Sequence, residues 1–167
     1  MTQSAGLVLL NPYLPTLFAR RDLTEAGAFR SVEAIEHAFD LLHYIAFGDV
    51  AHDGGPRPLE RTICGVQSDL AIRPAMPLDR DAAALVDGLL QSVISQWTLL
   101  GKTTTEGLRE AFLRREGVLE WHEEQAQLRV SPKSYDMLLD SMPWSFGVIR
   151  FPWMDKPLHV KWRGDDG

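Results

Sequence analysis

The spacing of apolar residues changes near Gly117, and this change limits the folds that the chain can adopt. Before Gly117 most apolar residues recur at intervals of three and four, the spacing of one face of an α-helix. After Gly117 they recur at every second residue, the spacing of a strand with one buried face. The sequence therefore predicts an α+β domain, whose helical first two-thirds packs on a small antiparallel sheet.

Helical segments fill the region before Gly117. The clearest runs from about Val32 to Phe47, with Ser31 as its N-cap and a glycine at its end. A shorter helix is expected from Pro12 to Arg20, and another at about Leu59 to Val66. The longest is expected from about Asp81 to Leu100, and its wide apolar stripe predicts that it is the buried centre of the domain.

A capping box of Thr103 and Glu106 is expected to open a further helix that ends near Arg115, before the strands begin. Two hairpins are then expected to form the sheet. The first pairs a strand containing Leu119 and Trp121 with a strand over 126–130, and each strand has one polar face.

The second hairpin is expected to pair residues 147–151 with 158–162, through a turn near Asp155, Lys156 and Pro157. A short helix at about 133–141 lies between the two hairpins. The whole chain is predicted to be a single domain over residues 1–163, followed by a flexible tail at 164–167.

Composition and charge exclude several classes of protein. The chain has 167 residues, enough for one buried core, and a net charge of −6. No basic stripe for phosphate contacts is present, which argues against nucleic-acid binding. A single cysteine, Cys64, allows no internal disulfide and fits a reducing compartment. The apolar run at Leu7–Leu10 is too short for a signal peptide or a membrane span, so synthesis and folding in the cytosol are expected.

Signals for an enzyme are weak. Gly101, Lys102 and Thr103 resemble the end of a phosphate-binding loop, but Gln96 stands where that loop needs its first glycine. Cys64 has apolar neighbours and is expected to be a packed residue, although a pairing with His52 can be judged only in space.

A metal site on one helix is conceivable from sequence spacing. Glu33 and His37 are four residues apart, and Asp40 and His43 are three apart, so each pair shares a helix face. The longest helix offers only Asp87 as a further ligand, too few for a carboxylate-bridged site. We therefore expect a solvated helix face, with no catalytic residue, cofactor or metal.

Aromatic residues gather in the last part of the chain. Aromatic side chains favour strands and fill cores, whereas tryptophan is also frequent among the residues that dominate protein interfaces. The sequence leaves both roles open. The candidate partner-contact residues are Trp144, Phe146, Phe151, Trp153, Met154 and Trp162.

Six stretches, in this order along the chain, resemble the contractile injection system tape measure family. Any one of them is weak, but the ordered set is specific and spans about Ala5 to Trp162. The stretches are Ala5–Pro15, Ile63–Gly65, Glu106–Gly117, Leu138–Trp144, Ile149–Met154 and Leu158–Trp162.

The resemblance implies a structural part of a phage-tail-like, toxin-injecting bacterial particle, without cofactor or catalytic residues. It implies partners among the inner tube, the baseplate hub or the terminator, and leaves a homo-oligomer open. The protein would be in the bacterial cytoplasm during assembly and then inside the tube of the particle.

Family members are usually much longer, and a folded chain of this length has a radius of gyration of only about 15 Å. A body of this size cannot gauge a long tube. The sequence is therefore expected to be a fragment, the docking module of a longer tape measure. The alternatives are a stand-alone assembly chaperone or cargo adaptor, and a small metal- or thiol-dependent enzyme that uses Cys64 or the helix carrying Glu33 and His43.

Overall fold

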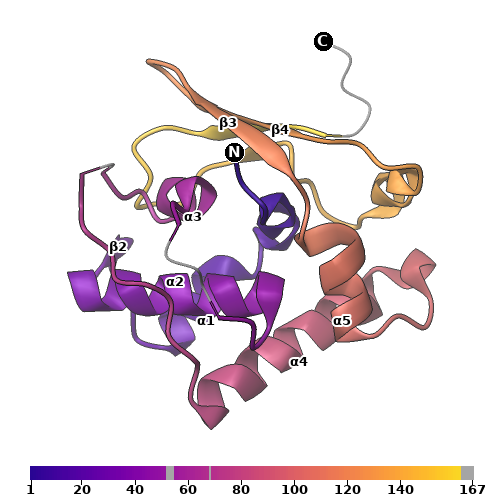
Figure 1. The fold of residues 1–167 in the computed structure, drawn as a ribbon, viewed down its shortest axis with the longest axis horizontal. Coiled ribbons are helices and arrows are strands. Elements are labelled where there is room, and N and C mark those ends of the chain that lie inside the picture. Colours follow the sequence, from indigo (N-terminus) through magenta and orange to yellow (C-terminus); the bar gives the residue numbers. More distant parts are fainter. Residues whose placement is uncertain (52–54, 68, 163–167) are drawn as a thin grey trace.

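The computed structural model describes residues 1–51, 55–67 and 69–162. A four-stranded sheet lies across a layer of helices (Figure 1). This arrangement confirms the predicted α+β class. The predicted tail at 164–167 lies outside the described residues. In the described ranges no helix is long and apolar enough to cross a membrane.

The N-terminal segment is part of the core. Residues Ala5–Leu10 form a 3-10 helix, η1, in which all six residues are buried. A Cβ at Gly6 would lie 1.8 Å from the carbonyl oxygen of Phe112, so only glycine allows the two backbones to meet here. Helix η1 could not be predicted from the sequence, because a run of this length is too short to show a helical period.

The next elements lead the chain across the helical layer. Helix α1 (Leu14–Arg20) begins two residues later than predicted. It is followed by a small antiparallel pair, β1 (Thr24–Glu25) and β2 (Ala28–Phe29), which the sequence analysis did not predict. Two-residue strands are too short for an alternating pattern to identify.

Helix α2 (Val32–Phe47) has both of its predicted ends. The Ser31 side chain accepts a hydrogen bond from the amide of Ala34, and Gly48, at φ 65°, ends the helix. The N-cap and the glycine with positive φ act on adjacent backbone groups. Both ends of α2 can therefore be predicted from the local sequence.

The longest helix, α4 (Arg80–Gln96), is not the centre of the domain as predicted. Only four of its 17 residues are buried, whereas eight of the 16 residues of α2 are buried. Part of the predicted stripe, including Leu85 and Leu89, is only half-buried. The α4 helix ends at Gln96, and a separate 3-10 turn, η2 (Thr98–Leu100), follows it.

The predicted capping box is also wrong. Helix α5 (Thr105–Leu108) is capped by Thr104, whose hydroxyl accepts from the amide of Gly107. Thr103 instead donates to the carbonyl of Leu100. Helix α5 continues into one π-helical turn, η3 (Arg109–Leu113), so the helical path still covers most of the predicted segment.

The sheet contains the two predicted hairpins, each antiparallel. Strands β3 (Gly117–Trp121) and β4 (Ala126–Val130) pair over five residues, and β5 (Val148–Ile149) pairs with β6 (Leu158–Lys161). The strand order is β3-β4-β6-β5, and β4 and β6 run parallel. The sheet is therefore mixed rather than wholly antiparallel, because the two hairpins join through a parallel pair.

The predicted helix between the hairpins is a 3-10 helix, η4 (Asp136–Ser141). At its start Asp136 accepts two hydrogen bonds, each of 2.8 Å, from the buried guanidinium of Arg115. This ion pair joins the end of the helical layer to the segment that leads into the second hairpin. Because both groups are buried, loss of either partner would leave the other charge unpaired.

Candidate functional site

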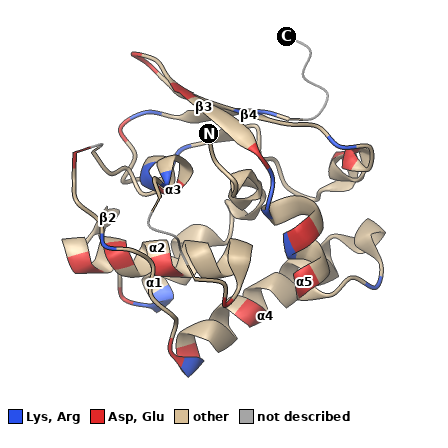
Figure 2. Ribbon diagram, in the orientation of Figure 1, with Lys and Arg blue, Asp and Glu red and all other residues tan. Residues whose placement is uncertain are grey.

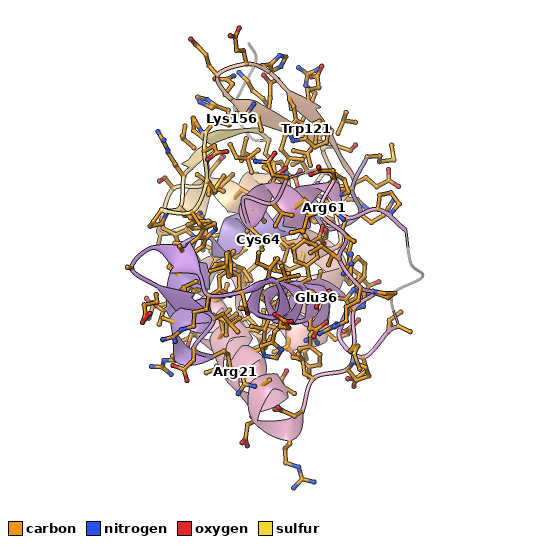
Figure 3. All side chains as sticks on the ribbon, turned by 90° about the vertical axis from the view of Figure 1, so that its left-hand side faces the viewer. Arg21, Glu36, Arg61, Cys64, Trp121 and Lys156 are labelled. Carbon is orange, nitrogen blue, oxygen red and sulfur yellow. The ribbon has the colours of Figure 1, made fainter. Side chains whose placement is uncertain are left out.

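The Cys64 thiol is poorly suited to nucleophilic chemistry. It is buried at the end of helix α3 (Pro58–Ile63) and points into the interior (Figure 3). Burial, and secondly the charge of Glu60, raise the pKa of the thiol well above its ordinary value. A thiol that stays protonated is a weak nucleophile. The histidine considered as its partner, His52, lies outside the described residues.

The face of α2 expected to be solvated is partly buried, because Asp40 is buried and acidic residues on this face bind an arginine. The Asp40 carboxylate accepts two hydrogen bonds of 2.9 Å from Arg73, and Glu36 accepts one of 3.0 Å from the amide of Arg73. Burial acts to raise the pKa of Asp40, but hydrogen bonds from His37, Arg73 and the amide of Met76 lower it to about 2. Within the described ranges, no group of three His, Cys, Asp or Glu side chains is arranged to hold a metal.

The segment that resembles a phosphate-binding loop is the end of a helical turn. Gly101 ends η2 with φ 67°, and Lys102 beside it is exposed. A phosphate-binding loop joins a strand to a helix, whereas here helical structure lies on both sides. The geometry needed to surround a phosphate is therefore not formed by these residues.

The three C-terminal tryptophans connect distant parts of the chain through hydrogen bonds. Each indole N–H donates a hydrogen bond to a residue that is far away in sequence. The pairs are Trp144 with the Leu9 carbonyl (2.6 Å), Trp153 with the Ile63 carbonyl (2.8 Å) and Trp162 with the Asp136 carboxylate (3.0 Å). Several of the stretches that carry the family resemblance are thus joined to one another inside the fold.

The other candidate partner-contact residues also pack against the interior. Phe151 and Met154 are buried, as is Trp162. Phe146 lies edge-on to Trp162 and is half-buried, as are Trp144 and Trp153. The structure gives all six a place in or against the core, and their contact with a partner stays a prediction.

The exposed tryptophan is one that the sequence analysis placed on a buried face. Trp121, the last residue of β3, exposes 56% of its surface, whereas Leu119 on the same face exposes 7%. In Figure 1 the tip of the β3–β4 hairpin extends past the helices, and near this tip α3 covers the Trp121 ring only in part. Alternation predicts which face a residue is on, but not how far the next layer extends.

A groove lies beneath Trp121. It has a volume of about 630 Å³ and separates α3 from the end of β3 and from the loop before β6. We call it the Trp121 groove. Its lining residues include Pro58, Arg61, Thr62, Trp121, Met154 and Lys156.

Hydrogen bonds hold the walls of the Trp121 groove. The indole N–H of Trp121 donates to the hydroxyl of Thr62 at 3.2 Å, which fixes the ring over α3. On the opposite wall, the ammonium of Lys156 donates to the carbonyl of His122 at 2.7 Å. Figure 3 shows Trp121, Arg61 and Lys156 together at the sheet end of the molecule.

Charge differs between the hairpin and α3. Acidic residues lie along the β3–β4 hairpin toward its tip, whereas Arg57 at the start of α3 and Arg61 within it are basic (Figure 2). Glu60, also on α3, is buried. The Arg61 side chain donates to the carbonyl of Leu70 at 2.8 Å, so its charge is held close to the Trp121 groove. The groove therefore combines an exposed aromatic ring with the cations Arg57, Arg61 and Lys156, and Asp155 is an acidic residue in its lining.

The chain is thus a small α+β domain with an exposed tryptophan over a groove and a buried thiol. Residues 1–162 match the family described as contractile injection system tape measure protein, so the chain belongs to this family. The match confirms the resemblance found in the sequence and covers nearly the whole chain. No curated protein and no solved structure matches the chain.

Proposed function

We propose that this domain docks a tape measure protein to another component of the injection particle, which is the inner tube, the baseplate hub or the terminator. Membership of a structural family supports an assembly role rather than catalysis. The proposed role needs no cofactor, because a docking domain acts through its surface.

The size of the folded domain supports anchoring rather than measurement. A compact chain of this length has a radius of gyration of about 15 Å, much smaller than the same chain extended. The dense contacts among η1, the tryptophans and the sheet favour this compact form. The domain is therefore suited to hold one end of a longer assembly in place.

The observation that carries the proposal is the exposure of Trp121 over a groove. The other four tryptophans are buried or half-buried, whereas Trp121 exposes 56% of its surface although its indole N–H also donates a hydrogen bond, to Thr62. An exposed tryptophan beside a pocket is typical of the residues that contribute most to binding energy at interfaces.

The test is to make particles with variant tape measures and to measure their yield and tube length by electron microscopy. Deletion of residues 1–162 should abolish assembly or broaden the length distribution. Trp121→Ala should weaken docking, whereas Met137→Ala removes an apolar residue of similar exposure (61%) on η4 and should have no effect. Normal yield and length after the deletion would refute the proposal.

We also infer that the domain is made in the bacterial cytoplasm and lies inside the tube of the assembled particle. The family membership supports the second location. Protease treatment of intact and of disrupted particles tests it, because a domain inside the tube should be cut only after disruption. Cleavage in intact particles at the rate seen for the free domain would contradict this location.

A further inference from the structure

Strand β3 is an edge strand whose outer side is mostly open. Its inner side pairs with β4 along its whole length. On its outer side, Thr2 forms an antiparallel bridge with Gly117 through bonds of 2.8 and 3.0 Å. The chain's N-terminus lies at this edge (Figure 1). The geometry for adding a strand therefore already exists at one end of β3.

Alternation along β3 shows which backbone groups remain on the outer side. The N–H and C=O of Gly117 point toward Thr2, and those of every second residue must point the same way. The N–H and C=O of Leu119 and Trp121 therefore point outward. Within residues 1–51, 55–67 and 69–162, these outward groups have no hydrogen-bond partner. We call them the free edge of β3.

The free edge runs into the Trp121 groove. Trp121 belongs to both, because its backbone lies on the edge and its ring covers the groove. A strand paired with Leu119 and Trp121 would place alternate side chains on the groove side of the sheet. Recognition by strand addition combines these two elements, backbone hydrogen bonds for affinity and pockets for alternate side chains.

Charge indicates the kind of strand that fits. On the solvent face of β3, the carboxylates of Glu116 and Glu120 are exposed, and neither has an ion pair in the described part of the chain. Opposite charges on neighbouring strands stabilise a sheet, and like charges destabilise it. In a symmetric pairing of two copies centred on Glu120, this residue would face its own copy. The charges therefore favour a basic partner strand over a second copy of this chain.

We propose that the free edge of β3 binds an extended segment of a partner protein as an antiparallel fifth strand. The segment has Lys or Arg on the face beside Glu116 and Glu120, and apolar residues on the face toward the Trp121 groove. This proposal rests on the proposed docking function and assigns its surface and the chemistry of its partner.

The probe is a fluorescently labelled eight-residue peptide in which Lys and Val alternate, with binding measured by anisotropy at low salt. In an antiparallel fifth strand, the valines face the groove and their amides bond to β3. N-methylation of the valine amides should abolish binding, whereas N-methylation of the lysine amides should leave it nearly unchanged. Equal binding of the two methylated peptides would overturn strand addition, because simple charge attraction does not distinguish them.

Two variants test the charge. Glu120→Lys should weaken binding about tenfold, since it replaces an attractive cross-strand pair by a repulsive one. Glu110→Lys makes the same change at an exposed position on η3 and should have no effect beyond that of net charge. If the two variants bind the peptide with equal affinity, the proposed recognition of basic residues by Glu120 would be overturned.

Two further outcomes would overturn the proposed occupant. A dimer in light scattering to which the peptide does not bind would assign the edge to a second copy of this chain. If the peptide fails to bind while particle assembly still depends on residues 1–162, the free edge of β3 is not the binding surface. The docking function itself would then still stand. Normal assembly without the domain would instead refute the docking function itself.

Discussion

Gly65 allows α3 to meet the second hairpin, and its replacement by alanine should destabilise the domain. Gly65 has φ 65°, and a Cβ there would lie 2.3 Å from the carbonyl oxygen of Trp153. The left-handed conformation alone costs alanine about 1 kcal/mol relative to glycine. The contact forces the backbone at Trp153 to shift.

The shift at Trp153 adds to this cost. Its indole N–H donates to the carbonyl of Ile63, and its ring packs on Phe18 and Phe29 at centroid distances of 5.8 and 5.0 Å. Loss of the hydrogen bond costs about 1 kcal/mol, and weaker ring contacts cost about another 1 kcal/mol. We therefore expect Gly65→Ala to lower the free energy of unfolding by about 3 kcal/mol.

Urea denaturation followed by circular dichroism measures this change, and two other glycines supply matched controls. Gly101 has φ 67° but nothing within 4 Å of an added Cβ, so Gly101→Ala should cost only the backbone contribution of about 1 kcal/mol. Gly88 lies within α4 and also has open space, so Gly88→Ala should stabilise the domain by about 0.5–1 kcal/mol. Equal costs for Gly65→Ala and Gly101→Ala would refute the packing argument.

Three further predictions follow from the buried polar groups. The pKa of Asp40 is about 2, against an ordinary value of 3.8. This difference contributes about 2 kcal/mol to the free energy of unfolding above pH ~4. This stability should be lost as the pH falls toward 2, and Asp40→Asn should make the fall of urea midpoints with pH shallower. Cys64 should react with a disulfide reagent only as fast as the domain opens, and at once in urea; fast native labelling would contradict its burial. Trp162→Phe should lower the unfolding free energy by about 1–2 kcal/mol, because Asp136 loses one donor but keeps Arg115; an unchanged urea midpoint would contradict this.

Local signals in the sequence predicted part of the fold correctly. The boundaries of α2 are correct because Ser31 and Gly48 act on adjacent backbone groups. The capping box failed because adjacent threonines are equally good caps, and only the packed structure selects Thr104 over Thr103. The parallel pairing of β4 with β6 could not be predicted, because it joins strands that are distant in sequence and leaves no local pattern.

The interaction surface was harder to predict than the core. The aromatic residues that carry the family resemblance form internal contacts, such as that between Trp144 and Leu9. Trp121 follows the alternation of a buried face, yet its exposure depends on where the helical layer ends beneath β3. Its neighbours His122, Glu123 and Glu124 are the signal that could have identified it, since such a polar run is typical of a projecting turn.

The most direct test of the account measures binding of the purified domain to each tube, hub and terminator protein of the same particle. One of these components should bind the wild-type domain and the Glu110→Lys variant alike. The same component should bind Trp121→Ala and Glu120→Lys about tenfold more weakly or worse. A domain that binds none of the components, or that binds one with the same affinity in all four forms, would contradict docking through β3 and the Trp121 groove.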